Sequence, residues 1–346
     1  MDGALLLASP MVIFFVVGAF FAAISREVQL PPLVSRIFAM LMLFAIGVKG
    51  GASLGGHGLD GRVLTVIIAG IALSVAMTLL AFATLCRATS VRQHDAAGIA
   101  AHYGSISIVT FATMTLMLKA EGVAYDGWMV SLAALMEIPA ILTALVLARL
   151  AVSSSDVTVE MAEGGGAATM GSGASGGAAA EGGGFGASIA AVVQNPGVQL
   201  LVGAFAVGWL AGEINAGWDE DISTGLFPVV VCLFLLDQGI SVGRRLASLR
   251  RRFDKRLAVF ALAMPVIGAI AGLITGLVLG LSAGNTALMM ALAGSASYIA
   301  APAATRVALP GARPELYLTL SLCMTLPFNL LIGLPLWLAL ATWLAG

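Results

Sequence analysis

The sequence carries little charge. Only 10% of its 346 residues are Asp, Glu, Lys or Arg, while 60% are hydrophobic, and the mean hydropathy is +1.02. Because soluble domains carry about 25% charged residues, this composition excludes an ordinary soluble protein and predicts an integral membrane protein. The net charge of -1 and the lack of a basic domain argue against a nucleic-acid partner.

Cysteine and histidine are also scarce, with three of each. Cys86, Cys232 and Cys323 lie in apolar segments without CxxC spacing, which disfavours a disulfide framework or a cysteine metal site. No histidine stands at metal-ligand spacing from another ligand, and no nucleophile–base pair is evident. We therefore expect no enzyme, no cofactor and no transition metal, and regard a receptor as a weaker alternative.

Long apolar runs cover most of the chain. A membrane-spanning helix needs about 20 mostly apolar residues, which predicts an all-α integral membrane protein with ten transmembrane helices. The predicted helices are 8–25, 31–54, 62–85, 95–120, 126–150, 190–214, 222–242, 257–281, 285–308 and 315–344.

One segment between the fifth and sixth helices differs in composition. Residues 153–188 are rich in Gly, Ala and Ser, and such a segment cannot bury enough apolar surface to fold. We interpret it as a flexible cytoplasmic linker. It separates a first five-helix repeat, 1–152, from a second, 189–346.

The two halves resemble each other. Three motifs recur at offsets of 185, 190 and 188 residues: "VGAF" at 17 and 202, "GSIS" at 104 and "GSAS" at 294, and "MEIPA" at 136 and "MTLPF" at 324. An odd number of helices in each half places the second half upside down. This 5+5 inverted repeat is typical of secondary transporters.

Basic residues predict the orientation. If the loop 243–256, with seven Lys and Arg, is cytoplasmic, thirteen basic residues lie inside and three outside. Both termini are then external. We expect a multi-pass protein of the bacterial inner membrane.

The fourth and ninth helices contain the breaks "AHYGSISIVTFATM" and "LAGSASYIAAPAATR". Non-helical backbone at membrane depth is tolerated where it is buried in protein or lines a cavity. The start of the second half-helix favours an anion, and the bare carbonyls that end the first favour a cation. Two matched breaks therefore predict one site for a small anion and sodium; close helix packing by Gly and Ser is the alternative. The substrate-binding candidates are Gly104, Ser105, Ser107, Thr110, Gly294, Ser295, Ser297 and Tyr298.

Glu137, in "LMEIPA", is an ionisable residue at membrane depth and hence a candidate for holding sodium or cycling a proton. A carboxyl that only hydrogen-bonds across helices is the alternative. The second half offers neutral Thr325 and Asn329 at the matching place. The candidate cation ligands are Glu137, Ser107, Ser297, Thr325 and Asn329.

Other polar residues leave two readings open. Asp237 is a further cation candidate or the ion-pair partner of Arg244 or Arg245, and His102 is a further candidate or an ordinary buried histidine.

Arg36 and Lys49 are expected to flank the second helix and snorkel. His94 and Asp95 are expected to begin the fourth helix. The glycines of the eighth helix, spaced four apart, predict a packing face: Gly268, Gly272, Gly276 and Gly280.

Three stretches resemble the sodium-dependent bicarbonate transporter family: "HYGSISIVTFATMTLMLKAEGVAYDGWMVSLAALMEIPA", "CLFLLDQGISVGRRL" and "ASYIAAPAATRVALPGARPELYLTLSLCMTLPFN". The resemblance implies ten helices in a core and a gate domain, a homotrimer, an elevator-like motion, and bicarbonate and sodium at the crossing of helices 4 and 9. It also implies a cytoplasmic PII-like regulator. Glu137 takes the place of the family's helix-5 aspartate.

The chain departs from the family pattern at Tyr298, where the family carries an acid, and at Ala300 and Ala301. We therefore expect a secondary active transporter that imports a small anion, bicarbonate first, with sodium. A sodium- or proton-coupled carrier of another small anion, such as a monocarboxylate, is the alternative.

Overall fold

The computed structural model describes residues 10–25, 30–58, 60–162, 196–213, 227–249, 254–298, 301–302, 305, 309 and 311–346, and its regular elements in these ranges are helices. They are α2 (Pro10–Ile24), α3 (Pro32–His57), α4 (Gly61–Ala88), α5 (Gln93–Gly104), α6 (Ile108–Ala120), α7 (Met129–Ala162), α9 (Pro196–Glu213), α11 (Phe227–Leu249), α12 (Lys255–Val278), α13 (Ala283–Ala293), α15 (Pro314–Leu318), the π-helix η2 (Thr319–Thr325), α16 (Leu326–Phe328), the π-helix η3 (Asn329–Gly333) and α17 (Leu334–Ala345).

The described helices include seven that are long and apolar enough to cross a membrane, counting α5–α6 and α15–α17 as one span each. Three shorter apolar helices accompany them, at Val12–Ile24, Gln199–Glu213 and Ala283–Ala293. The prediction of an all-α membrane protein is confirmed.

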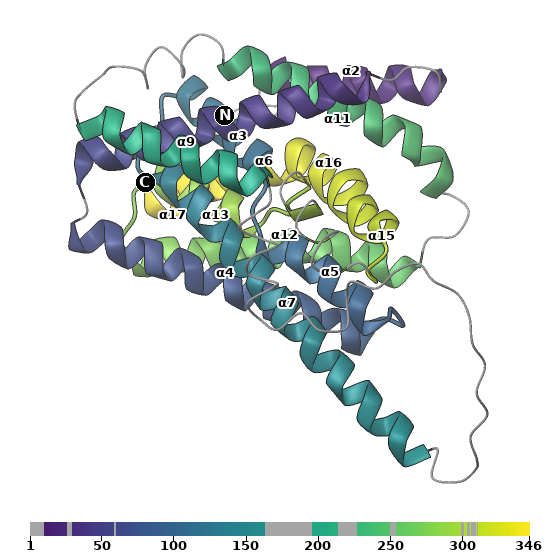
Figure 1. Cartoon of the computed structure of the whole chain (residues 1–346). Coiled ribbons are helices and arrows are strands. Elements are labelled where there is room, and N and C mark those ends of the chain that lie inside the picture. Colours follow the sequence, from purple (N-terminus) through teal and green to yellow (C-terminus); the bar gives the residue numbers. More distant parts are fainter. Residues whose placement is uncertain are drawn as a thin grey trace.

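The helices form two groups (Figure 1). The scaffold layer consists of α2, α3, α9 and α11, in which α3 packs along α9 and α2 packs along α11. The core layer consists of α4 to α7 and α12 to α17. In it α4 contacts α5 and α7, and α12 contacts α13. Both helix breaks lie in the core layer.

Glycine brings the scaffold helices close together. A Cβ at Gly51 of α3 would collide with the carbonyl oxygen of Phe205 on α9, and a Cβ at Gly208 with that of Val48. Gly18 and Gly239 stand in the same relation between α2 and α11. Lipid is as apolar as the helix surfaces, so the hydrophobic effect does not drive two helices together in a membrane. Van der Waals contact between backbones, which small residues allow, stabilises these pairs instead.

We expect Gly51→Ala to destabilise the protein by about 1–3 kcal/mol, because an extra methyl in a close-packed contact forces the helices apart. Thermal unfolding in detergent checks this. The matched control is Gly203→Ala on α9, where a Cβ meets no atom within 4 Å. Equal melting temperatures for the two variants would refute backbone contact as the source of stability.

The glycine stripe of α12 is confirmed as a packing face. Gly268 and Gly272 lie against the backbone oxygens of Ala293 and Met289 on α13, and Gly276 lies against the Thr286 side chain. Gly280 lies beyond the end of the helix, with φ of +62°.

Several segments differ from the predictions. α7 continues to Ala162, into the expected linker 153–188, and residues 163–188 of that linker lie outside the described residues. The predicted span 285–308 ends as a helix at Ala293, and most of 299–308 lies outside the described residues. Lys49 does not flank its helix but lies within α3, with Nζ 5.9 Å from the centroid of the Phe227 ring.

Candidate functional site

The first break follows from local sequence. α5 ends at Gly104, where a Cβ would collide with the Thr78 side chain, so only glycine fits. Ser105 to Ser107 are extended, and α6 begins at Ile108. Ser107 caps the new helix, since its Oγ accepts a hydrogen bond from Thr110 N at 3.2 Å. The chain thus stops and restarts a helix inside the core layer.

The second break crosses the first. α13 ends at Ala293, and Gly294 to Tyr298 are non-helical. Ser107 N donates to Ser295 Oγ at 2.8 Å, and Ser297 N donates to the His102 carbonyl at 2.8 Å. Ser107 and Ser297 occupy the same place in the "GSIS" and "GSAS" motifs. The backbone N–H of each serine therefore donates a hydrogen bond to the other broken helix.

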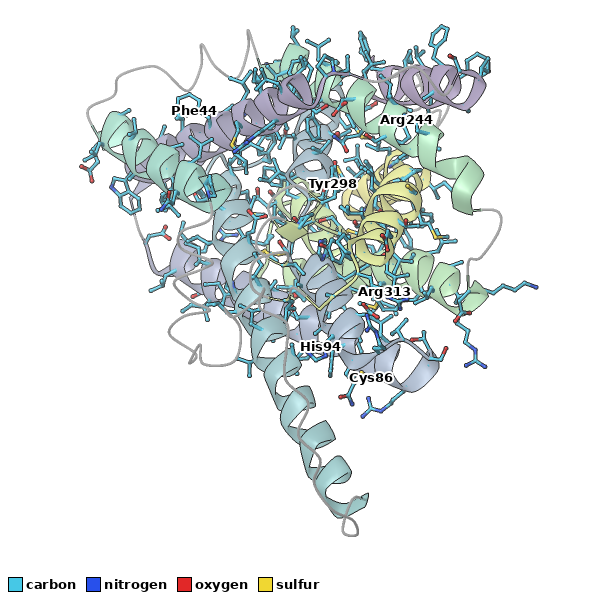
Figure 2. The ribbon with its side chains drawn as sticks, turned by 45° about the vertical axis from the view of Figure 1, so that its right-hand side comes forward. Phe44, Cys86, His94, Arg244, Tyr298 and Arg313 are labelled. Carbon is cyan, nitrogen blue, oxygen red and sulfur yellow. The ribbon has the colours of Figure 1, made fainter. Side chains whose placement is uncertain are left out.

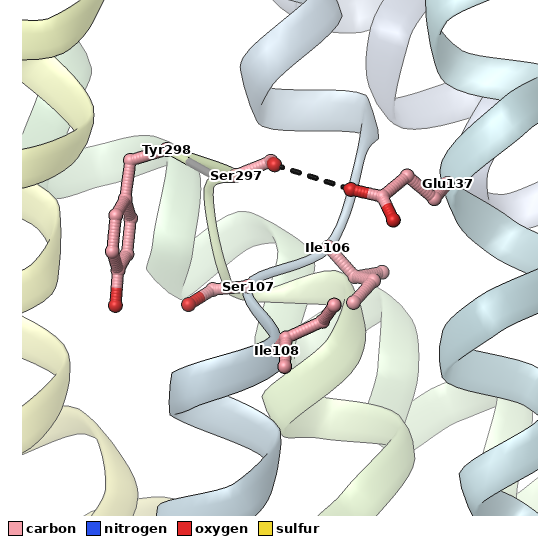
Figure 3. Close-up of a pocket in the computed structure, with 6 residues that line it drawn as sticks. All are labelled: Ile106, Ser107, Ile108, Glu137, Ser297 and Tyr298. Carbon is pink, nitrogen blue, oxygen red and sulfur yellow. Dashed lines mark hydrogen bonds between the residues drawn. The ribbon is translucent and has the colours of Figure 1, made fainter. Parts of the chain in front are cut away.

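Glu137 reaches this crossing from α7. Its carboxylate is buried, and Oε1 accepts a hydrogen bond from Ser297 Oγ at 3.4 Å (Figure 3). The Ser105 hydroxyl lies next to the carboxylate, but within the described residues neither it nor Oε2 makes a hydrogen bond of regular geometry. A buried carboxylate with so few partners needs a counter-charge or a proton. The surrounding hydroxyls supply the hard oxygen donors that a sodium ion takes.

A small pocket lies at the crossing, lined by Ile106, Ser107, Ile108, Glu137, Ser297 and Tyr298 (Figure 3). The space between these residues is too small to admit a water molecule. The described conformation is therefore closed, and a ligand needs its walls to separate.

Tyr298 links the pocket to the scaffold layer, and Figure 2 places it near the middle of the molecule. Its ring stacks on Phe234 of α11, with centroids 6.4 Å apart and planes 16° apart. Its hydroxyl is buried and lies near the Ser107 side chain, but it makes no hydrogen bond of regular geometry within the described residues. An unpaired buried hydroxyl at a pocket wall is a donor available to an anion.

Two predicted cation ligands lie beside the breaks and do not line the pocket. Thr325 Oγ1 donates to the Ala261 carbonyl at 2.8 Å and lies 2.7 Å from Tyr103 Oη. Asn329 Nδ2 donates to the Gly294 carbonyl at 2.9 Å and so holds the end of α13. Both residues belong to π-helices, which are frequent at functional sites.

The remaining candidates are spread around the crossing. Thr110 stands in the first turn of α6, and its buried Oγ1 has no partner in the described residues. His102 stacks on Tyr317 with centroids 4.2 Å apart, and its Nδ1 lies 2.7 Å from the Gly98 carbonyl. Asp237 lies in the scaffold layer. Its Oδ1 accepts from Ser35 Oγ at 2.8 Å, an arrangement that the expected pairing with a basic residue did not anticipate.

Asp95 lies in the first turn of α5, at the end away from the crossing, as expected for a helix start. Its side chain is fully buried and forms ion pairs with Arg92 at 3.0 Å and Arg313 at 2.8 Å. The hydrogen bond to this carboxylate raises the pKa of Arg92 above its ordinary value. Arg313 and His94 lie in the same region, away from Tyr298 (Figure 2). The pairs tie α5 to the start of α15.

Sequence reasoning missed Ser74 of α4. Its buried hydroxyl lies 2.9 Å from the Gly104 carbonyl and 2.8 Å from the Met136 carbonyl. It thus connects the first break to the turn that carries Glu137. The only signal in the sequence is a single serine in an apolar helix, which is too common to single out.

We expect Ser74→Ala to raise the KM for the transported anion by about tenfold, because two buried carbonyls lose a shared donor worth about 1–3 kcal/mol. The maximal rate should change less than KM, since the pocket side chains remain. Initial rates in proteoliposomes check this. Thr65→Ala, which removes an exposed hydroxyl bond on the same helix, is the control. Identical kinetics for both variants would remove the positioning role.

Comparison with known proteins gives one family match. The model of the Na+-dependent bicarbonate transporter superfamily matches residues 10–342, nearly the whole chain. Among curated proteins, the comparison finds no match.

Proposed function

Because the chain belongs to the Na+-dependent bicarbonate transporter superfamily, a family of transporters and not of enzymes, we propose that it imports bicarbonate together with sodium. The observation that carries the proposal is the crossing, where two hydrogen-bonded breaks, three serines and one buried carboxylate meet.

The anion takes the side of the pocket at the start of α6. First-turn N–H groups have no partner within a helix, and the helix dipole favours negative charge there. Ile108 is the first residue of α6 and lines the pocket, and the Tyr298 hydroxyl adds a second kind of donor.

The cation takes the side of Glu137, with Ser297 and Ser105 as neutral oxygen ligands. An anion entering next to an ionised Glu137 meets a like charge. At about 4 Å and an effective dielectric constant near 20, the repulsion is about 4 kcal/mol. A sodium ion between the two negative groups removes this penalty, so sodium binding and anion binding favour each other.

Alternating access follows from the proposed 5+5 inverted repeat with ten spans. The repeat relates α2 to α9 and α3 to α11. It therefore converts the contact between α2 and α11 into the contact between α9 and α3, and the scaffold layer contains both contacts, which supports the proposal. The core layer carries both breaks, and one of its contacts with the scaffold is the stacking of Tyr298 on Phe234. We propose that the core layer moves against the scaffold, with 1–152 and 189–346 as the two repeats.

The orientation and assembly are proposed on the grounds of charge and family. The basic loop 243–256 is placed in the cytoplasm and both termini outside, in a bacterial inner membrane. A homotrimer and a cytoplasmic PII-like regulator follow from the family resemblance.

Purified protein in proteoliposomes tests the proposal. Labelled bicarbonate is expected to accumulate when an inward sodium gradient is imposed, and not when choline replaces sodium. Accumulation without sodium, or none with it, would contradict the proposed coupling.

A monocarboxylate is the second candidate cargo. The observation that favours it is the pocket wall, where Ile106 and Ile108 offer apolar surface and a single carboxylate faces the cargo. Competition of acetate and lactate against labelled bicarbonate separates the two, since a bicarbonate carrier is expected to ignore both.

A further inference from the structure

The scaffold layer contains a buried carboxylate that the site at the crossing does not use. Asp237 of α11 is only 5% exposed. Its Oδ1 accepts from Ser35 Oγ at 2.8 Å, and its Oδ2 accepts from Gln238 Nε2 at 3.3 Å. The two ion pairs of the described residues both belong to Asp95, so neither neutralises this carboxylate. Burying an ionisable group at membrane depth costs free energy, so such a group is a candidate functional residue.

The face of α11 that carries Asp237 differs from the one that packs on α2. Gly239 and Gly243 contact the backbone of α2. Phe234, Asp237 and Gln238, at i, i+3 and i+4, share the opposite face of the helix. Phe234 is the residue on which Tyr298 of the pocket stacks. Asp237 therefore lies three residues, a rise of about 4.5 Å, along α11 from Phe234, whose ring centroid is 6.4 Å from that of Tyr298 at the pocket.

This face changes character at Phe234. Toward the start of the helix it carries Phe227 and Val230, and toward Arg244 it carries Asp237, Gln238 and Ser241. The polar part lies between Phe234 and Arg244 along α11. Ser35 stands in the first turn of α3.

We propose that Asp237, Ser35 and Gln238 form a second cation site, a station that receives the sodium ion released from Glu137. The carboxylate oxygens of Asp237 and the hydroxyl oxygen of Ser35 suit a hard monovalent cation, and the Gln238 amide, whose Nε2 donates to the carboxylate in this structure, turns over to offer its oxygen when the cation binds. The site rests on the proposed function for its role in transport, but its ability to bind sodium does not.

Sodium binding tests the site without transport. Line broadening of the ²³Na resonance by purified protein is expected to persist in Glu137→Gln, because the second site remains. It should fall to the level of a protein-free sample when Asp237→Asn is added. Equal broadening in the single and double variants would overturn the site, whatever happens to the proposed function.

Transport tests the role. At saturating sodium on both sides, bicarbonate exchange does not require sodium release, so Asp237→Asn should retain exchange within about twofold of wild type. Net uptake into sodium-free vesicles should fall about tenfold, and Asp237→Glu should restore most of it. Exposed Glu213→Gln is the control. Unchanged net uptake in Asp237→Asn, as a permanently protonated carboxyl predicts, would overturn the role.

A structural contribution of the Ser35–Asp237 bond is separable. Ser35→Ala breaks the bond between α3 and α11 but keeps the carboxylate. We expect it to reduce net uptake less than Asp237→Asn does. If both variants lose exchange and net uptake equally, the bond only holds the helices together, and the proposal fails.

Discussion

Glu137→Gln is expected to abolish sodium-driven accumulation of the anion, with a fall of at least about 100-fold. Glutamine keeps the shape of the side chain and its hydrogen bond with Ser297 but removes the charge that attracts the cation. Without that charge the anion no longer meets a like charge, so its binding should become independent of sodium. A repulsion of about 4 kcal/mol is large enough for an effect of this size.

The measurement is sodium-dependent uptake in proteoliposomes together with anion binding to the purified variant in sodium-free buffer. Glu213→Gln, an exposed carboxylate in the scaffold layer, is the matched control and should behave as wild type. A sodium dependence in Glu137→Gln that matches wild type at several pH values would exclude this carboxylate as the coupling group.

Ser107→Ala combined with Ser297→Ala should have a comparable effect on the anion, reducing uptake by about 100-fold or more. Interactions of a hydroxyl with a charged group contribute about 1.5–3 kcal/mol each, and the double variant removes the Ser107 hydroxyl beside the anion and the Ser297 hydroxyl that holds the cation on which anion binding depends. Loss of the cap at Ser107 also costs about 1 kcal/mol of stability, so folding must be checked by thermal unfolding.

Ser282→Ala provides the control for the cap. Ser282 caps α13 by accepting from Asn285 N at 3.4 Å, and it does not line the pocket. It should lose similar stability and keep its transport. Full uptake by a folded Ser107→Ala, Ser297→Ala protein would mean that the anion binds elsewhere.

The breaks could be predicted from the sequence because their cause is local. Gly104 and Gly294 weaken a helix, and the serines beside them satisfy freed backbone groups. The structure ends α5 and α13 at these glycines. The recurring motifs predicted two breaks at matching depths, and in the structure the two breaks are in contact. Whether the pocket binds an anion stays a prediction.

Other features depend on contacts between residues far apart in the chain, which the sequence alone does not reveal. Thr325 and Asn329 were predicted as cation ligands, and in the structure both stand in π-turns and contact Tyr103 Oη and the Gly294 carbonyl. A π-turn has the same apolar composition as an α-turn, so no pattern distinguishes them. Asp237 was close in sequence to many arginines, yet its partner Ser35 comes from another helix.

The central claim is that anion and sodium share one site at the crossing, and the binding of each measured with and without the other tests it most directly. Titration calorimetry of the purified protein is expected to show sodium raising bicarbonate affinity by at least about tenfold. By thermodynamic linkage, bicarbonate must raise sodium affinity by the same factor. The coupling should vanish in Glu137→Gln. Affinities that are independent of the other ligand, or a coupling that survives the loss of Glu137, would contradict the account.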